Sequence, residues 1–158
     1  MDALIYATSE GKKNLERKLD ELVSKREEIA HQIKEAREFG DLKENAEWAA
    51  AREAQTNLEE EIAAIKTKLP LIKLFSYAKA DTSVINIGTR VKLDNMTTRK
   101  SETWVITGVI ESDPERGYIS NETPLGSALI GKKQGEIIEI KMPAGKIKYR
   151  VVKIEPAV

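Results

Sequence analysis

Cysteine is absent from this sequence, and histidine occurs once, at His31. Without cysteine the chain can form no disulfide, use no catalytic thiol and build no cysteine-based metal site. A metal site with at most one histidine would need carboxylate ligands. The sequence also lacks any apolar run near the roughly 18 residues of a membrane span, and its N-terminus lacks the basic-then-apolar order of a signal peptide. We therefore expect a cytoplasmic protein that does not associate with a membrane.

Proline and glycine are scarce in the first half of the chain. All five prolines lie at position 70 or later, and Gly40 is the only glycine between Lys12 and Ile87. On each side of Gly40, apolar residues recur in alternating steps of four and three, which is the spacing of a coiled-coil seam. With Arg26 and Gln55 at the skipped positions, these residues are Leu15, Leu19, Leu22, Ile29, Ile33 and Ala36, then Trp48, Ala51, Leu58, Ile62, Ile65 and Leu69. The pattern predicts two long helices.

The two helices are predicted to form an antiparallel hairpin, because the segment 39–42 between them is short. Thr8 or Ser9 can cap the first helix, since a short side-chain oxygen accepts a hydrogen bond from a free amide of the first turn. Pro70 ends or kinks the second helix, because it has no amide proton. At about 1.5 Å per residue, the stretch 15–39 spans on the order of 37 Å. With only one apolar seam, the far end of the hairpin projects into solvent unless another molecule receives it.

From about Ala80 onward, β-branched residues appear in alternation with polar ones. The segments that fit strands of a compact antiparallel sheet are 89–93, 102–110, 117–120, 135–142 and 146–154. Residues 143–145 fit the turn of the final hairpin, and 123–131 fit a loop followed by a short helix. The predicted fold class is therefore α+β. The predicted domains are a helical hairpin at 1–78 and a β-rich domain at 84–158, with the linker at 77–86.

The formal net charge is zero, from 26 basic and 26 acidic residues. This balance argues against a protein that binds nucleic acid by neutralising phosphates along its whole surface. The charges are nevertheless unevenly distributed: residues 35–61 contain nine acids and three bases, whereas 62–79 contain four lysines and no acid. The far half of the predicted hairpin is therefore acidic, with an acidic tip at 38–47.

At this tip, Asp41 and Glu44 are three residues apart, and their spacing leaves two interpretations open. In the first, Asp41 caps the second helix and Glu44 favours its positive end, as in a capping box. In the second, the projecting carboxylates offer oxygen ligands to a hard cation such as Mg²⁺. The flanking bases Arg37 and Arg52 also allow two roles, because they can pair with neighbouring glutamates or position a phosphate.

Three segments resemble the motifs of one known family. The segment GDLKENAEWAAARE at 40–53 resembles the GDL-x-ENAEY-x-A-A-[KR]-E signature of the bacterial Gre transcript-cleavage factors. The segment TPLGSALIGKKQGE at 123–136 resembles their SPLG-x-ALLGK-x-x-GD segment, and SEGKKNLERKLDEL at 9–22 is similar to their N-terminal EG-x-x-x-L-x-x-EL pattern. The resemblance covers nearly the whole chain in order. The acidic hairpin, which has no extended basic face, is more similar to the GreA branch than to the GreB branch.

The resemblance implies an N-terminal antiparallel coiled coil and a C-terminal antiparallel β domain similar to FK506-binding proteins. It implies RNA polymerase as the partner, with the β domain docked at the rim of the secondary channel and the coiled coil inside it. Asp41 and Glu44 would help hold a second Mg²⁺, shared with the polymerase active centre, for hydrolysis near the 3′ end of the nascent RNA. By this resemblance the chain is not itself an enzyme but stimulates the polymerase's own cleavage of backtracked transcripts. We expect it to act as a monomer.

The resemblance also implies contacts with polymerase or RNA around the tip. The residues at matching or neighbouring positions are Arg37, Gly40, Leu42, Lys43, Asn45 and Arg52, of which the two arginines would guide the RNA 3′ end. Lys43 departs from the family pattern because serine is common there, and Trp48 departs from it because tyrosine is usual. Lys43 places a positive charge between the two acids, where it either weakens metal capture or contacts an RNA phosphate.

Two other functions are compatible with parts of the sequence. A regulator that occupies the polymerase channel without supporting hydrolysis is favoured by Lys43 and disfavoured by the Asp41 and Glu44 pair. A peptidyl-prolyl isomerase would follow from the FK506-binding-like domain. Pockets of such enzymes are rich in aromatic residues, whereas the aromatic residues beyond Ala80 are Trp104, Tyr118 and Tyr149. Both alternatives therefore rank below the transcript-cleavage factor.

Overall fold

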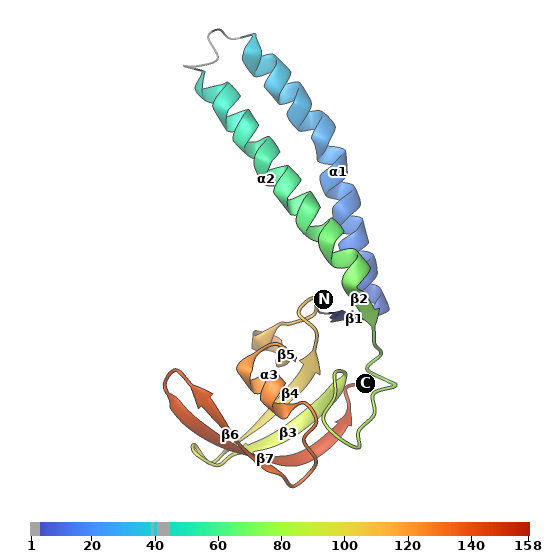
Figure 1. Ribbon diagram of the computed structural model, residues 1–158, viewed down its shortest axis with the longest axis vertical. Helices are drawn as coiled ribbons and strands as arrows, with labels where there is room; N and C mark the ends of the chain where they lie inside the picture. Colours follow the sequence, from blue (N-terminus) through green and yellow to red (C-terminus); the bar gives the residue numbers. More distant parts are fainter. Residues whose placement is uncertain (1–3, 39, 41–44) are drawn as a thin grey trace. The chain divides into compact units, whose positions relative to one another are not determined.

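The computed structural model describes residues 4–38, 40 and 45–158 (Figure 1). Its elements are β1 (Ile5–Ala7), α1 (Ser9–Arg37), α2 (Ala46–Lys68), the 3₁₀ helix η1 (Leu69–Leu71), β2 (Ile72–Leu74), β3 (Thr89–Asn95), β4 (Lys100–Thr107), the 3₁₀ helix η2 (Pro114–Arg116), β5 (Tyr118–Ser120), α3 (Pro124–Leu129), β6 (Ile137–Met142) and β7 (Gly145–Pro156). The predicted α+β class, with two long helices before an antiparallel-rich sheet, is confirmed. No helix in the described part is long and apolar enough to cross a membrane.

The chain divides into two compact units. Lys12–Leu71 forms the hairpin unit, and the N-terminal residues up to Gly11 join Ile72–Val158 in the β unit. The N-terminal residues belong with the β unit because β1 pairs with β2 in a parallel two-stranded sheet. The domain boundaries proposed from the sequence, at 78 and 84, stay a prediction.

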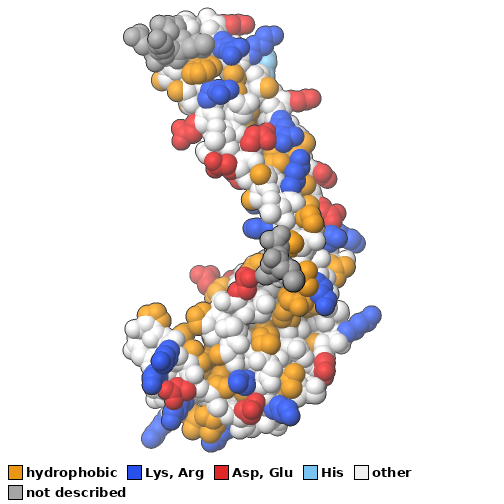
Figure 2. Space-filling view, in the orientation of Figure 1, with side chains coloured by type: hydrophobic (Ala, Val, Ile, Leu, Met, Phe, Trp, Pro, Cys, Tyr) orange, Lys and Arg blue, Asp and Glu red, His pale blue; other side chains and the backbone are white. Residues whose placement is uncertain are grey.

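In the hairpin unit, α1 and α2 lie side by side and antiparallel (Figure 1). Every residue of the predicted seam is buried or partly buried, so the heptad pattern is confirmed. The buried cluster consists of Leu22, Leu58, Ile62 and Ile65, with Leu15, Leu19, Ile29 and Leu69 packed against it. Figure 2 shows acidic and basic side chains interspersed along the visible surface of these helices.

The predicted helix ends also agree with the structure. The Thr8 hydroxyl accepts a hydrogen bond from the Gly11 amide at 3.0 Å, which is the capping contact expected at the start of α1. At the other end, α2 stops at Lys68, and Pro70 lies in the 3₁₀ turn that follows. Both ends therefore follow from local chemistry, a capping hydroxyl at one and a missing amide proton at the other.

The β unit contains a five-stranded sheet in the order β5-β4-β3-β7-β6. Three of its four strand pairs are antiparallel, as predicted, whereas β4 and β5 pair in parallel, which the sequence pattern did not indicate. A parallel pair needs a connection that carries the chain back along the first strand. Residues 108–117, which include η2, supply this connection, whereas the sequence pattern had extended the strand to Ile110.

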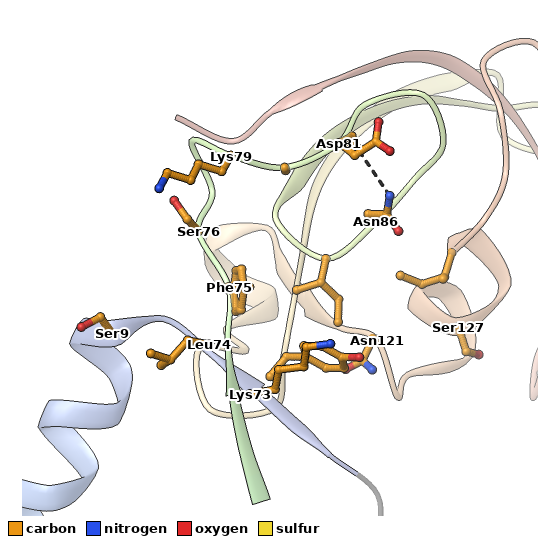
Figure 3. Close-up of a pocket in the computed structure, with 14 residues that line it drawn as sticks. Ser9, Lys73, Leu74, Phe75, Ser76, Lys79, Asp81, Asn86, Asn121 and Ser127 are labelled. Carbon is orange, nitrogen blue, oxygen red and sulfur yellow. Dashed lines mark hydrogen bonds between the residues drawn. The ribbon is translucent and has the colours of Figure 1, made fainter.

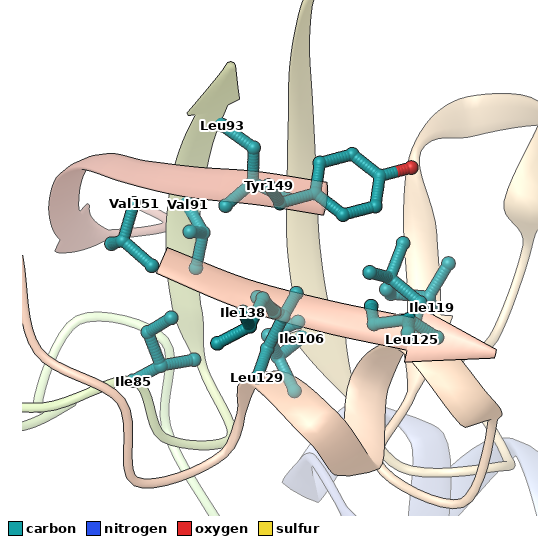
Figure 4. Close-up of a cluster of buried hydrophobic side chains, with 11 residues drawn as sticks. Ile85, Val91, Leu93, Ile106, Ile119, Leu125, Leu129, Ile138, Tyr149 and Val151 are labelled. Atoms are coloured by element: carbon teal, nitrogen blue, oxygen red, sulfur yellow. The ribbon is translucent and has the colours of Figure 1, made fainter. Parts of the chain in front are cut away.

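One face of the sheet is covered by α3, whose Leu125 and Leu129 share a buried cluster with Ile106, Ile119 and Ile138 (Figure 4). The motif at 123–126 explains how this short helix is placed. Thr123 caps it by accepting from the Gly126 amide at 3.0 Å, and Pro124 occupies the first turn, where no amide partner is needed. A Cβ at Gly126 would lie 2.1 Å from the Ser120 carbonyl oxygen, so only glycine permits this approach.

The sheet of β1 and β2 was not predicted, because strands of three residues are too short to show alternation. Gly108 lets β1 pack closely, since a Cβ there would lie 1.8 Å from the Tyr6 carbonyl oxygen. The predicted linker 77–86 is also packed within the β unit. Ile85 is fully buried, and the Tyr77 hydroxyl is 3.1 Å from the Thr107 hydroxyl. The linker pattern therefore marked a segment without regular structure that nevertheless packs against the sheet.

Candidate functional site

The residues predicted to form the site fall into two groups. Asp41, Leu42, Lys43 and Glu44 lie outside the described residues. Arg37, Gly40, Asn45 and Arg52 are described, and they bracket those four along the chain. The functional roles assigned to all eight stay predictions. The geometry around the tip is therefore given by the residues on either side of it.

Asn45 links the two helices beside the tip. Its Oδ1 accepts a hydrogen bond from the Trp48 amide at 3.1 Å, and its Nδ2 donates to the Ala36 carbonyl oxygen. Asn45 is therefore the N-cap of α2, and the same side chain satisfies a carbonyl of the last turn of α1. The capping of α2, which spacing alone had allowed for Asp41, belongs to Asn45. The available signal was an asparagine directly before the alanine-rich run of α2.

Gly40 has a backbone φ of +126°, in the region that favours glycine. A Cβ built at this position would meet no atom within 4 Å among those described. Glycine is therefore required by the backbone conformation rather than by lack of space. The end of the first helix is thus followed by a residue whose conformation other amino acids rarely adopt.

Arg37 and Arg52 are both exposed. In the described part of the chain, no ion pair involves either arginine, so this part gives no support to pairing with neighbouring glutamates. The Arg52 guanidinium carbon lies 5.8 Å from the centroid of the Trp48 ring, within the range of a cation–π contact. Its Nη1 also donates to Gln55 Oε1 in a long hydrogen bond of 3.4 Å. The guanidinium of Arg52 therefore lies against the ring of Trp48 on the surface of α2.

Two exposed pairs lie on the helices of the hairpin. Arg26 donates two hydrogen bonds of 2.8 Å to the two carboxylate oxygens of Glu59, across the hairpin. These bonds lower the pKa of Glu59 and raise that of Arg26. His31 contacts Glu35 at 3.0 Å and faces water, as its place between seam residues predicted. Exposed pairs of this kind contribute little to stability, so we assign them to the solvated flanks of the coiled coil.

Packing between the helices becomes thinner toward the tip. A hollow of about 350 Å³ lies between them, lined by Gln32, Glu35, Ala36, Glu47, Ala50, Ala51 and Ala54. Farther from the tip, leucine and isoleucine fill the seam instead. Around this hollow the alanine side chains bury less apolar surface than leucine or isoleucine, so the seam holds the two helices less strongly there.

The described residues alone do not build a metal site. Among them, no group of three or more histidine, aspartate or glutamate side chains is placed to hold a metal ion. The predicted ligands Asp41 and Glu44 lie outside the described residues, so their metal-binding role stays a prediction. Two carboxylates are the right chemistry for a hard cation but too few for a complete coordination shell.

The β unit contains a polar contact that the sequence did not predict. Glu111 Oε1 accepts hydrogen bonds from both the amide and the hydroxyl of Thr8, each at 2.8 Å. A Cβ at Gly11 would lie 1.9 Å from the same oxygen, so glycine leaves room for the carboxylate. The sequence offered one signal for this contact, the Glu10–Gly11 pair of the N-terminal motif. A glycine is not favoured in a coiled-coil helix, so its presence there indicates a close contact.

The β unit also contains a cavity of about 900 Å³ (Figure 3). Lys73, Leu74, Phe75 and Ser76 line one side, and Ser127 belongs to the opposite side. Near its rim, the Asn86 side-chain amide donates to the Asp81 carbonyl oxygen at 3.3 Å. None of the predicted site residues lines this cavity. The residues predicted to carry the chemistry therefore belong to the hairpin unit and not to the lining of this cavity.

Comparison with known proteins agrees with both units. The model of a family described as "Transcription elongation factor, N-terminal" matches residues 5–73, and that described as "Transcription elongation factor, GreA/GreB, C-term" matches 80–156. Two relatives named transcription elongation factor GreA, from Roseiflexus sp. and Caldanaerobacter subterraneus, are 38% and 39% identical, each over 98% of this chain and 99% of the relative. The solved structure of GreA factor homolog 1 (Gfh1) from Thermus thermophilus is 22% identical over 96% of this chain and 99% of its own, with a TM-score of 0.44. The chain belongs to the GreA/GreB family of transcription elongation factors.

Proposed function

We propose that this protein inserts its helical hairpin into the secondary channel of RNA polymerase and stimulates Mg²⁺-dependent cleavage of the 3′ end of backtracked transcripts. Membership of the elongation-factor family supports this proposal, as does the match of the tip segment to the family signature. The partners in this proposal are RNA polymerase and the nascent RNA, which places the protein in the cytoplasm. Cleavage would rescue polymerases arrested by backtracking.

The observation that carries the proposal is the form of the hairpin unit. Helices α1 and α2 contain 29 and 23 residues. At about 1.5 Å per residue, they extend roughly 43 and 35 Å. They are joined across the tip end by the hydrogen bonds of Asn45 to Ala36 and Trp48. Two paired helices are on the order of 20 Å wide, so they can carry a short acidic segment into a narrow channel.

The donor set of the tip fits Mg²⁺. Asp41 and Glu44 offer carboxylate oxygens, which are ligands that this ion prefers, and the chain has no cysteine to compete. When bound, the ion would activate water or stabilise the leaving oxygen in phosphodiester hydrolysis. Because two carboxylates do not complete a coordination shell, we propose that the polymerase supplies the other ligands. In that arrangement the factor stimulates the polymerase and is not an enzyme on its own.

Transcript cleavage in stalled elongation complexes tests this proposal directly. The RNA is labelled, purified factor is added at physiological Mg²⁺, and the variants Asp41→Asn and Glu44→Gln are compared with the unmodified protein. Each variant should abolish stimulated cleavage while competing normally with the unmodified protein for polymerase. Glu53→Gln, which removes an exposed acid of α2 beyond the tip, is the matched control and should retain cleavage. Undiminished cleavage by both tip variants would overturn the proposal.

The channel-occupying regulator remains a second candidate because of Lys43. Its positive charge between the two acids would compete with a cation for their oxygens. This candidate predicts binding to polymerase without stimulated cleavage, and gain of cleavage in Lys43→Ser. The same assay therefore separates the two functions.

The isomerase alternative gains no support from the β unit. The Glu102 carboxylate accepts hydrogen bonds from the Trp104 indole at 2.9 Å and from the Tyr149 hydroxyl at 3.2 Å. Tyr149 is also buried, so two of the three aromatic residues considered for such a site are held in the packing of the sheet. Robust turnover in a proline-isomerisation assay would reverse this ranking.

A further inference from the structure

Trp48 and Arg52 are one helical turn apart on α2, directly after the N-cap. Residues at this spacing lie one above the other on the same face of a helix. The Arg52 guanidinium carbon lies 5.8 Å from the centroid of the Trp48 ring. The start of the helix that carries both residues is fixed by Asn45, which caps the Trp48 amide at 3.1 Å and also bonds Ala36. The pair therefore lies in the first turns of α2, whose start Asn45 fixes.

Trp48 itself is only partly exposed, and its indole nitrogen is inaccessible to water. Arg52, in contrast, is exposed. An exposed arginine normally samples many rotamers, and ordering it on binding carries an entropic cost. An aromatic ring under the guanidinium reduces that freedom, because the cation is attracted to the electron-rich face. The ring thus restricts Arg52 in the free protein.

A guanidinium held near an aromatic ring keeps most of its N–H donors along its edge. One of these donors makes the 3.4 Å contact with Gln55, which is too long to hold it firmly. Among the described residues no carboxylate pairs with Arg52. The arrangement is therefore suited to an incoming anion with several acceptor oxygens, such as a phosphate of an RNA backbone.

We propose that Trp48 is a positioning residue, whose ring holds the Arg52 guanidinium ready to bind a phosphate of the nascent RNA beside the acidic tip. This inference rests on the proposed function, because it assigns RNA as the occupant. It makes Trp48 functional through Arg52 rather than through contact with RNA. Trp48 also remains a seam residue, so packing and positioning must be separated by experiment.

The test is a double-mutant cycle in the transcript-cleavage assay, with Trp48→Leu, Arg52→Gln and the double variant. Leucine keeps an apolar side chain in the seam but removes the ring face. Since a cation–π contact at an exposed site is worth about 0.5–1 kcal/mol and 1.4 kcal/mol is tenfold, Trp48→Leu should lower the maximal cleavage rate about two- to fivefold. Trp48→Tyr, which keeps an aromatic face, should lose less. In the Arg52→Gln background, Trp48→Leu should cause no further fall in the maximal cleavage rate.

Two readouts separate positioning from packing. In Arg52→Gln, the slope of the logarithm of the cleavage rate against the logarithm of the salt concentration should become shallower by about 0.7. This is the change expected when one phosphate contact with a single strand is lost. Trp48→Leu should show part of the same change, whereas Arg26→Gln, the matched loss of an exposed arginine of α1, should show none. In the free protein, the NMR signal of the Arg52 Nε–H group should move in Trp48→Leu because the ring current is removed.

The possible outcomes are distinct. Additive losses from Trp48→Leu and Arg52→Gln would overturn the inference, as would an Arg52 signal that does not respond to the loss of the ring. A salt dependence that Arg52→Gln leaves unchanged would also overturn it, because phosphate would not be the occupant. If the unmodified protein gives no stimulated cleavage, the proposed function itself fails, and this inference fails with it. Thermal unfolding of each variant identifies any loss that comes from the fold.

Discussion

The side-chain amide of Asn45 donates a hydrogen bond to the carbonyl oxygen of Ala36, nine residues earlier in the chain. The same side chain caps α2 through the Trp48 amide. One residue therefore fixes the distance between the last turn of α1 and the first turn of α2.

Substitution of Asn45 should loosen the tip end of the hairpin. Asn45→Ala removes both hydrogen bonds, and the loss of an N-cap alone costs about 1 kcal/mol. Asn45→Asp keeps a capping acceptor but has no N–H to donate to Ala36, so it should fall between the unmodified protein and Asn45→Ala. Urea unfolding followed by far-UV circular dichroism measures these differences. Equal stability of Asn45→Asp and the unmodified protein would show that the bond to Ala36 contributes nothing.

Two glycines of the β unit should differ sharply in their tolerance of a methyl group. At Gly108 the added Cβ would meet the Tyr6 carbonyl oxygen at 1.8 Å, and backbone cannot move aside easily. At Gly11 it would meet the end of the Glu111 side chain at 1.9 Å, which can rotate away at the expense of its bonds to Thr8.

Gly108→Ala should therefore destabilise the β unit by about 1–3 kcal/mol or more, as overpacking does, and Gly11→Ala by less. Urea unfolding followed by the fluorescence of Trp104, in a background in which Trp48 is replaced by phenylalanine, reports on this unit. Adding Glu111→Ala should remove the clash at Gly11. The free energy of unfolding should therefore fall less in the double variant than the sum of its falls in the two single variants. A larger loss for Gly11→Ala than for Gly108→Ala would contradict the packing described above.

The hairpin was predictable because its signals are periodic and local. The spacing of Leu58, Ile62 and Ile65 alone predicts a coiled-coil seam. The missing amide proton of Pro70 predicts the end of α2. The cap was harder to predict. Asp41 and Glu44 have the spacing of a capping box, yet Asn45, directly before α2, caps the helix through the Trp48 amide. Its second bond, to Ala36, could not be predicted, because it forms only when the two helices pack together.

The long-range contacts of the β unit could not be read from the pattern. Tyr6 and Lys73 pair in a parallel sheet although 67 positions separate them, and nothing in either three-residue strand specifies its partner. The bond of Thr8 to Glu111 depends in the same way on tertiary packing. Glycines indicate where such close contacts occur, without indicating the partner. Gly108 and Gly126 lie where backbones approach too closely for a side chain, but the sequence alone does not name the approaching residue.

Hydrogen exchange should follow the change in packing along the hairpin. Near the tip, the seam contains Ala36 and Ala51 beside the hollow between the helices, whereas Leu58 and Ile62 fill it farther along. Less buried apolar surface means that local opening costs less free energy. The amides around Ala51 should therefore exchange faster than those around Ile62, as measured residue by residue by NMR. Uniform protection along α2 would contradict this expectation.

Burial raises the pKa of Tyr149 to about 12, and the nearby Glu102 carboxylate adds to the effect because it disfavours a second negative charge. The folded protein therefore holds the phenol proton more tightly than the unfolded chain, where the pKa is about 10. The resulting stability is fully present below pH 10 and is lost as the pH rises toward 12.

Tyr149→Phe should remove this loss from the pH dependence of unfolding, and ultraviolet absorbance should show one fewer phenol ionising near pH 12. Burial also raises the pKa of Tyr77, so Tyr77→Phe should remove a loss of the same sign and does not substitute for Tyr149→Phe. Ionisation of Tyr149 in the folded protein near pH 10 would show that its hydroxyl is neither buried nor held against Glu102.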